Sequence, residues 1–242
     1  MKKCIVSFSS HGRENYNQKL LGLIKSCKEA GWDGDYYLRS YDGYVDEYLG
    51  VKIKLGSYPV TERYGLCNNH SEIPYGFKPH MIQEAREQGY EQIIWCDSTI
   101  RMEKYPQFLI DYANDLGIAA HDNLGFPLYG WLNDYAQERL KISDENLKIV
   151  QQIMACQITF DFTNPKCVEI FDLWLSASRD GVSFQNYGSL RDGFKATRHD
   201  QAYLSGLLYN YEVPLLPYGK LVYPPHHESG EYGNDFYFVN GK

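Results

Sequence analysis

The chain has 242 residues, of which 43% are hydrophobic and 23% charged, the balance of an ordinary globular protein. Its formal net charge of -7 argues against a general grip on nucleic acid, which normally requires a basic face. No apolar run approaches the roughly 20 residues of a membrane-spanning helix, and the first residues turn polar at Ser7, too early for a signal peptide. Six scattered cysteines without a Cys-x-x-Cys pair favour a reduced, cytoplasmic protein.

The first 40 residues predict a strand, a helix and a second strand. The apolar run 3–8 ends in a polar loop, and apolar residues then recur at helical spacing from Leu20 to Cys27 until Gly31 ends the pattern. A second strand follows at 36–38. This order is a βαβ unit, whose two strands we expect to be parallel.

The centre of the chain predicts a helix and a buried strand. Residues 56–77 are rich in Gly, Pro, Asn and Tyr and show no period. Pro79 suits the first position of a helix, which Gly89 ends. The apolar run 92–96 then predicts a buried strand that ends at Asp97.

The second half continues to alternate between helices and strands. The elements we predict there are a helix over 106–116, a strand over 118–120, a polar stretch over 122–135, a helix over 134–153, a strand over 154–162, a helix from Pro165, a helix over 200–209 and an irregular cover from 210 onward. Such alternation favours an α/β fold in which helices flank a mostly parallel central sheet. We expect one domain, residues 1–242.

Asp97 is the most informative single residue. A buried strand that ends on an acidic residue places that residue at the rim of the sheet, and ligands of open α/β sheets bind at this carboxyl-end rim. A carboxylate there can hold a divalent cation, which in turn can hold a diphosphate. The alternative is that Asp97 only caps the following turn, a common role of Asp.

Several familiar motifs are absent. The chain contains no G-x-G-x-x-G after the first strand and no G-x-x-x-x-G-K-[ST], so the usual dinucleotide fingerprint and the P-loop are excluded. It also contains no G-x-S-x-G and no H-E-x-x-H, which excludes two classes of hydrolase.

The order of the remaining motifs resembles a glycosyltransferase of the GT-A fold. A βαβ start is followed by the helix opening Phe77-Lys78-Pro79 and by the strand end WCDST. The resemblance implies an Asp-x-Asp motif that holds Mn²⁺ or Mg²⁺ on the diphosphate of a nucleotide-sugar. Asp97 matches the first Asp, whereas Thr99 stands where the second would be and brings no charge.

Two later segments extend the resemblance. MACQITFDFTNPKCVEIFDLW looks like the strand and helix on the acceptor side, and RHDQAYLS looks like the (H/N)DQ segment that opens the next helix. The resemblance implies acceptor or sugar contacts from Gln157, His199, Asp200 and Gln201. A C-terminal histidine often completes the metal site in such proteins, and we assign this role to His227.

Other residues have two interpretations. Lys78 contacts the diphosphate or is a solvated lysine at a helix start. Asp200 acts on an acceptor hydroxyl or, as its position favours, caps the helix 200–209. Arg198 has comparable chances of a role in the site and of simple exposure. His121-Asp122, after the strand 118–120, is a weaker candidate of the same rim type as Asp97.

By fold analogy, residues after the first strand contact the nucleotide. We assign donor binding to Ser9, His11, Arg13, Lys78, Asp97, Ser98 and Thr99, and catalysis to Asp97 and Asp200. Residues 1–120 then form the nucleotide-sugar half, and residues 121–242 form the acceptor half and the C-terminal cover.

The expected function is transfer of a sugar from a nucleotide-sugar to an acceptor hydroxyl. A nucleotidyltransferase is the second candidate, although the loop SSHGR fits its phosphate loop poorly. A third is a non-catalytic carbohydrate-binding protein with the same fold, which the missing second Asp favours. Nucleic acid as an acceptor is not favoured because the chain is acidic.

Overall fold

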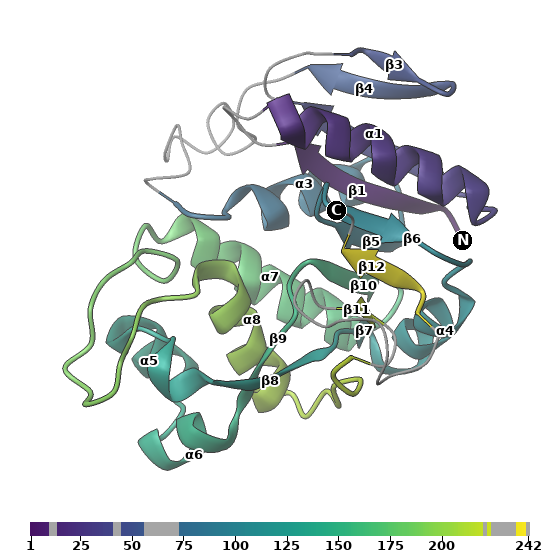
Figure 1. Ribbon diagram of the computed structural model, residues 1–242. Helices are drawn as coiled ribbons and strands as arrows, with labels where there is room; N and C mark the ends of the chain where they lie inside the picture. The colour runs from purple at the N-terminus through teal and green to yellow at the C-terminus, as the bar shows by residue number, and fades with distance from the viewer. Residues whose placement is uncertain (10–13, 41–44, 56–72, 220–221, 224–235, 241–242) are drawn as a thin grey trace.

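A central sheet with helices on both faces forms the body of the protein (Figure 1). The computed structural model describes residues 1–242 except 10–13, 41–44, 56–72, 220–221, 224–235 and 241–242. The described helices are α1 (Glu14–Glu29), α3 (Phe77–Glu87), α4 (Gln107–Leu116), α5 (Asp134–Leu140), α6 (Asp144–Ile149), α7 (Pro165–Arg179) and α8 (His199–Asn210), with a 3-10 turn at Leu128–Gly130.

The described strands fall into three sheets. The central one has the order β3 (Glu47–Tyr48), β4 (Val51–Leu55), β2 (Asp35–Ser40), β1 (Lys3–Ser9), β5 (Gln92–Cys96), β10 (Gln157–Asp161), β7 (Ile118–Ala119). The others are the three-stranded sheet β11 (Val222–Tyr223), β12 (Phe238–Asn240), β6 (Ile100–Met102) and the pair β8 (Asp122–Pro127), β9 (Gln151–Ile153).

The central sheet is mostly parallel, as the sequence predicts. β4, β2, β1 and β5 run in one direction, and the predicted parallel pairing of β1 with β2 is confirmed. β10 is antiparallel to both β5 and β7, so β7 runs with β5. The α/β fold with flanking helices is therefore confirmed, with β3 and β10 as the reversed strands.

Two hydrophobic cores lie on the two faces of the sheet. Trp95 and Phe160 point to the face covered by α3, α7 and α8, where Trp174 is also fully buried. Ile94 and Cys96 alternate with Trp95 and point to the face covered by α1 and α4. Because both faces are covered, strands β1 and β5 read as continuous apolar runs rather than alternating ones.

One edge of this sheet collects polar residues. Asp97 follows β5, and its backbone N–H donates to the carbonyl of Cys156, just before β10 begins (2.8 Å). His121 and Asp122 come directly after Ala120, beyond the end of β7, which runs in the direction of β5. Since β5 and β7 end where β10 begins, Asp97 and the residues after β7 lie along the same rim.

The helix predicted over 134–153 is wrong. The chain forms α5, turns at Lys141 in a left-handed conformation (φ 55°), forms α6 and ends in strand β9. Ser143 caps α6 by accepting from the N–H of Asn146 (3.2 Å), and this local bond restarts the helix. The polar stretch 122–135 likewise contains β8, which pairs with β9.

Smaller boundaries also differ from the prediction. Helix α3 begins at Phe77, so Pro79 is its third residue rather than its first. The described part of the tail is not only an irregular cover, because β12 pairs with β6, a strand that the sequence pattern did not predict. No helix in the described ranges is long and apolar enough to cross a bilayer. The five described cysteines are free thiols.

We expect Phe160→Ala to lower the free energy of unfolding by about 3–5 kcal/mol, because it leaves a cavity in a full core. Phe160 is fully buried, and its ring lies 6.2 Å from Trp174 and 5.9 Å from Phe171. Urea unfolding measures the change. The control is Phe108→Ala at a 45% exposed ring, for which we expect a loss below about 1 kcal/mol. Equal losses would contradict this placement of the core.

Candidate active site

The ammonium of Lys78 joins the two carboxylates that the sequence predicts as catalytic. Its Nζ lies 3.2 Å from Oδ1 of Asp97 and 3.3 Å from Oδ2 of Asp200. It also donates to the backbone carbonyl of Ala155 (2.8 Å). We call Lys78, Asp97 and Asp200 the lysine–carboxylate cluster. The cluster brings together α3, the end of β5 and the start of α8, which are far apart in the sequence.

Local structure explains how each member reaches the cluster. Lys78 is the second residue of α3, which packs beside β1 and β5. Asp97 follows Trp95 by two residues on the same face, and the Trp95 Nε1–H donates to Asp97 Oδ1 (2.8 Å). A turn then forms, in which the N–H of Ile100 donates to the carbonyl of Asp97 (2.9 Å).

Burial gives the cluster its electrostatic character. The side chains of Lys78 and Asp200 are each only 4% exposed, whereas that of Asp97 is 33% exposed. Burial raises the pKa of the Asp200 carboxyl above its ordinary value, and the Lys78 ammonium opposes this rise. Burial alone would lower the pKa of Lys78, but Asp200 and Asp97 more than compensate and hold it above its ordinary value. Asp97 is thus the carboxylate that faces outward.

Aromatic rings enclose the ammonium. The Trp95 ring centre lies 5.6 Å from Lys78 Nζ and the Tyr75 ring centre 5.3 Å from it. Tyr75 has a left-handed backbone (φ 60°), and its ring lies 5.7 Å from that of His199. No sequence pattern marked Tyr75, which falls in the aperiodic stretch 56–77. Trp95 could have been found, because alternation places it on the face of Asp97.

Asp200 does not cap α8, so that interpretation is wrong. The helix begins at His199 after Arg198, and no side chain caps it. Asp200 is the second helical residue, its carboxylate is directed to Lys78, and its carbonyl accepts from Trp174 Nε1 (3.1 Å). A carboxylate in the first turn is also favoured by the helix dipole.

The other residues predicted on the acceptor side lie apart from one another. His199 has a positive φ (47°), and its Nδ1–H donates to the carbonyl of Phe184 (2.7 Å). Gln201 donates through Nε2 to Gln152 Oε1 in β9 (2.9 Å). Gln157 is buried and donates to Thr159 (2.9 Å).

Gln157 belongs to the opposite face of the sheet from the cluster. It alternates with Ile158, which belongs to the core under α3, α7 and α8. The structure therefore brings Asp200 to Lys78 but does not bring Gln157 there. The sequence pattern of β10 already contained this alternation.

The residues predicted to bind the donor are only partly described. Ser9 is buried at the end of β1, and its hydroxyl donates to Asn17 Oδ1 of α1 (2.5 Å). Ser98 is buried, and its carbonyl accepts from Arg101 (3.1 Å), while Thr99 is half-buried. His11, Arg13 and His227 lie outside the described residues. Their roles, like that of Ser9, stay predictions.

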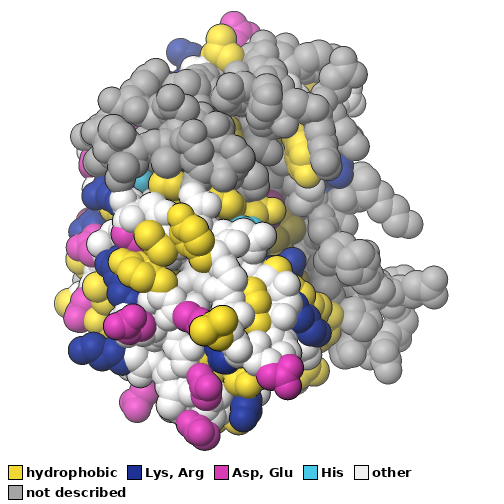
Figure 2. Space-filling model, turned by 90° about the vertical axis from the view of Figure 1, so that its left-hand side faces the viewer, with side chains coloured by type: hydrophobic (Ala, Val, Ile, Leu, Met, Phe, Trp, Pro, Cys, Tyr) yellow, Lys and Arg dark blue, Asp and Glu magenta, His cyan; other side chains and the backbone are white. Residues whose placement is uncertain are grey.

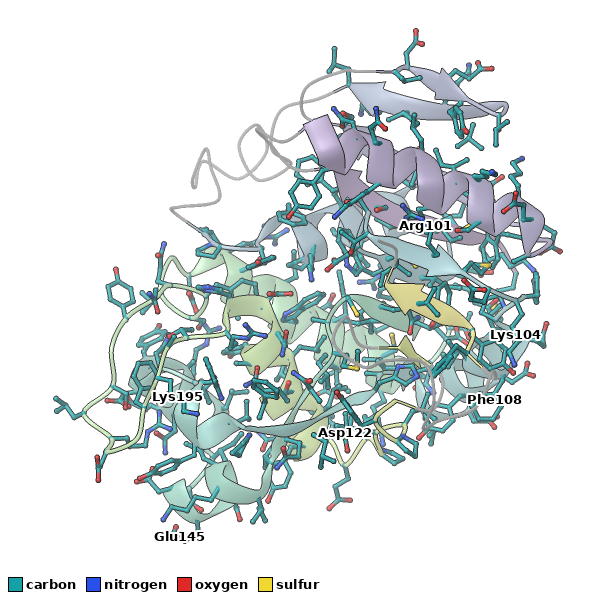
Figure 3. The ribbon with its side chains drawn as sticks, in the orientation of Figure 1. Arg101, Lys104, Phe108, Asp122, Glu145 and Lys195 are labelled. Atoms are coloured by element: carbon teal, nitrogen blue, oxygen red, sulfur yellow. The ribbon has the colours of Figure 1, made fainter. Side chains whose placement is uncertain are left out.

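The rim beyond β7 carries a second pair of polar residues, which the sequence marked only weakly. Burial raises the pKa of the Asp122 carboxyl, and its Oδ1 is buried without a hydrogen-bond partner. His121 is fully buried, and burial lowers its pKa to about 4. Asp122 lies at the start of β8, toward the middle of the molecule (Figure 3). The signal was the same as for Asp97: an acidic residue just after a short apolar strand.

Two aromatic rings and two cationic side chains form an edge that is joined to the start of α8. The rings of Phe126 and Trp131 are 5.8 Å apart. Lys195 and Arg198, both exposed, place their charges 5.4 and 5.5 Å from the Trp131 ring centre. The backbone N–H of Arg198 donates to the carbonyl of Trp131 (2.9 Å), which ties this edge to the start of α8. Lys195 lies on the segment before α8 (Figure 3).

Charges elsewhere on this side are mixed. Figure 2 shows acidic and basic side chains interspersed over the described surface, with hydrophobic side chains between them. Within the described ranges, no group of three or more His, Cys, Asp and Glu side chains is placed to hold a metal ion. What the arrangement offers chemically is one outward carboxylate, one buried carboxylate and a shared ammonium at the ligand-binding edge of the sheet.

Three solved structures that share this fold are glycosyltransferases. The apo bifunctional glycosyltransferase WbbM matches 91% of this chain, with 14% identity and a TM-score of 0.53. A glycosyltransferase involved in glycosylation of the major capsid of PBCV-1 matches 99% of this chain and 92% of its own, with 14% identity and a TM-score of 0.50. The galactosyltransferase LgtC, in complex with donor and acceptor sugar analogues, matches 100% of this chain and 87% of its own, with 12% identity and a TM-score of 0.51.

These similarities establish the fold. The chain spans only 39% of the WbbM chain, which is much longer. No model of a known protein family matches the sequence, and no curated protein matches it. The GT-A glycosyltransferase fold that the sequence resemblance implies is confirmed.

We expect Lys78→Met to lower the free energy of unfolding by about 3 kcal/mol or more, because it leaves the Asp200 carboxylate buried without its cation. Burial already raises the pKa of Asp200, and removal of Lys78 should raise it further. A carboxyl whose pKa is raised by folding favours the folded state when protonated. The deficit against wild type should therefore shrink as the pH falls from neutrality toward the ordinary Asp range. Urea unfolding at several pH values measures it.

The matched control is the double variant Lys78→Met/Asp200→Asn. It removes the unpaired charge, so we expect it to recover part of the stability at neutral pH and to lose the pH dependence. A double variant that is less stable than Lys78→Met would contradict an ionised Asp200 paired with Lys78.

Proposed function

We propose that this protein is a glycosyltransferase that moves a sugar from a nucleotide-sugar donor to an acceptor hydroxyl. The observation that carries the proposal is the lysine–carboxylate cluster, which lies at the carboxyl end of β5 in a fold shared with solved glycosyltransferases. Ligands of open α/β sheets bind outside the carboxyl ends of the strands, so the cluster is where a donor would lie.

The two carboxylates support different roles. Asp97 is one-third exposed and can accept hydrogen bonds from donor hydroxyls at the rim. Asp200 is buried against Lys78, so it is suited to accept one well-placed hydroxyl proton or hydrogen bond from a sugar. Lys78 holds both carboxylates in place and opposes the rise that burial causes in the pKa of Asp200. In this proposal residues 1–120 contribute the donor side.

The acceptor side is proposed for residues 121–242. The rings of Phe126 and Trp131 form a half-exposed surface, and Arg198 connects this surface to the start of α8 and so to Asp200. Aromatic rings of this kind pack well against the apolar faces of sugar rings. Asp122 lies on the same rim, and this half-buried residue offers a further carboxyl group to a sugar.

The residues around Asp97 do not fit the divalent cation that the sequence resemblance implies. Mn²⁺ and Mg²⁺ bind oxygen ligands, usually one or two protein carboxylates together with waters and phosphate oxygens. Here the Asp97 Oδ1 already accepts from Trp95 and pairs with Lys78, and Thr99 supplies only a neutral hydroxyl. We therefore derive no step through a metal. The role of His227 stays a prediction, since it lies outside the described residues.

The two alternatives have less support. A nucleotidyltransferase needs a basic phosphate loop after the first strand, and that loop falls within the undescribed residues 10–13. A non-catalytic carbohydrate-binding protein would keep the aromatic edge but would not need a buried carboxylate pair on a shared ammonium. Burial of the Asp200 carboxyl at 4% exposure costs stability, which favours a functional reason for it.

A panel of nucleotide-sugars in a thermal-shift assay tests the proposal. A ligand that binds only the folded state raises the melting temperature. We expect at least one nucleotide-sugar at roughly 1 mM to raise it, and the matching free sugar to do so less, because the nucleotide supplies most contacts. If no nucleotide or nucleotide-sugar raises the melting temperature with or without Mn²⁺, the transferase proposal is refuted.

We expect Asp97→Asn to reduce turnover or hydrolysis of the donor that the panel identifies by about 100-fold, because a neutral amide cannot replace the outward carboxylate. The matched control is Asp115→Asn in α4, an acidic residue at the end of a helix on the other face. We expect that variant to keep donor hydrolysis within about two-fold. Unchanged hydrolysis in Asp97→Asn would remove Asp97 from the mechanism.

A further inference from the structure

The ammonium of Lys78 lies among oxygen atoms. It carries three donors, and three oxygen atoms surround it: the carbonyl of Ala155, Oδ1 of Asp97 and Oδ2 of Asp200. Its side chain is 4% exposed. Lys78 therefore serves the two carboxylates rather than a phosphate, and its charge is already neutralised where it lies.

This arrangement weakens the need for a divalent cation between the two carboxylates. A metal ion between two carboxylates would hold them together, and Lys78 already does so, with one positive charge against two negative ones. A dication added beside a buried ammonium also meets like-charge repulsion, which is strong where water is scarce. Thr99 stands where a second rim carboxylate is expected. It therefore lacks the negative charge that would help to attract a dication, which also favours a site without a metal.

The diphosphate of a donor still needs a cation, and Arg198 is placed to supply it: it belongs to the acceptor half of the chain but directly precedes the start of α8, which brings Asp200 to the donor side. It is exposed, it directly precedes His199 and Asp200, and it forms no ion pair with another described residue. The pKa of Tyr75 is raised by burial, and the charge of Arg198 opposes this rise as that of Lys78 does, so Arg198 shares the surroundings of the cluster. A guanidinium binds two phosphate oxygens at once, which suits a diphosphate.

We propose that this site binds the donor diphosphate without a divalent metal. Lys78 supplies the positive charge between the carboxylates that a metal ion would otherwise supply, and Arg198 binds the diphosphate. The inference rests on the proposed function, since it concerns the same donor. It places this protein among transferases that stabilise the leaving nucleoside diphosphate with side chains alone. The positive charge then comes from the protein itself at every stage of donor binding.

The first experiment separates the inference from the proposed function. Metal-free full-length protein is titrated calorimetrically with UDP, GDP and dTDP, once with EDTA and once with excess Mn²⁺. We expect one of them to bind with a Kd that agrees between the two conditions within about two-fold. Binding only with Mn²⁺ would overturn the inference and leave the transferase proposal standing. Binding in neither condition would refute both.

A direct readout of the metal needs no donor. The electron paramagnetic resonance signal of free Mn²⁺ falls when the ion binds to a protein. We expect wild-type protein at roughly 100 μM to leave this signal unchanged, because an ammonium occupies the carboxylate pair. A loss of signal that disappears in Asp97→Asn would overturn the inference.

The second experiment tests Arg198 with a matched control. Lys195 lies over the same Trp131 ring at almost the same distance but three residues farther from the cluster along the chain. We expect Arg198→Gln to weaken nucleoside diphosphate binding about 10-fold or more and to flatten its salt dependence, and Lys195→Gln to change it less than about two-fold. Binding of the nucleoside without phosphates should not change in either variant. Equal effects of the two variants, or none from Arg198→Gln, would overturn the role of Arg198.

Discussion

A lysine ammonium that is almost wholly buried requires negative partners, and in this protein the requirement organises the site. Lys78 obtains two carboxylates and one carbonyl from three separate segments: the rim after β5, the first turn of α8, and Ala155 just upstream of β10. Loss of Lys78 would leave the buried Asp200 carboxyl without its cation, so α3 and α8 must meet beside the end of β5. The core beneath them, with Trp95 and Trp174, holds these elements in register.

The direction of the strands makes this meeting possible. β5 brings Asp97 to the carboxyl edge, and the reversed strand β10 starts at the same edge and offers the carbonyl of Ala155. A uniformly parallel sheet would end β10 there instead and would send its first residues to the far edge. The one reversal inside the sheet therefore contributes a ligand of Lys78. The exposed side of the cluster is left to Asp97, where a substrate can reach it.

Much of the fold could be predicted because apolar periodicity is local. The strands at 3–8 and 92–96, the helices near 106–116 and 200–209 and the α/β class follow from patterns within a few residues. The error at 134–153 arose because two short helices and a strand have a combined pattern close to that of one helix. Only the left-handed turn at Lys141 and the cap at Ser143 separate them, and the pairing of β9 with β8 depends on distant residues.

The sequence by itself determined that Asp97 lies at a strand end and that Lys78 and Asp200 lie near helix starts, because strand ends and helix starts are marked by neighbouring residues. It left the role of Asp200 open between a cap and a site residue, since both place Asp at the same position. Only the tertiary structure decided that Asp200 turns to Lys78 and that the ammonium stands between two carboxylates. These are contacts between residues up to about 120 positions apart, and no local pattern encodes a charge balance over such a separation.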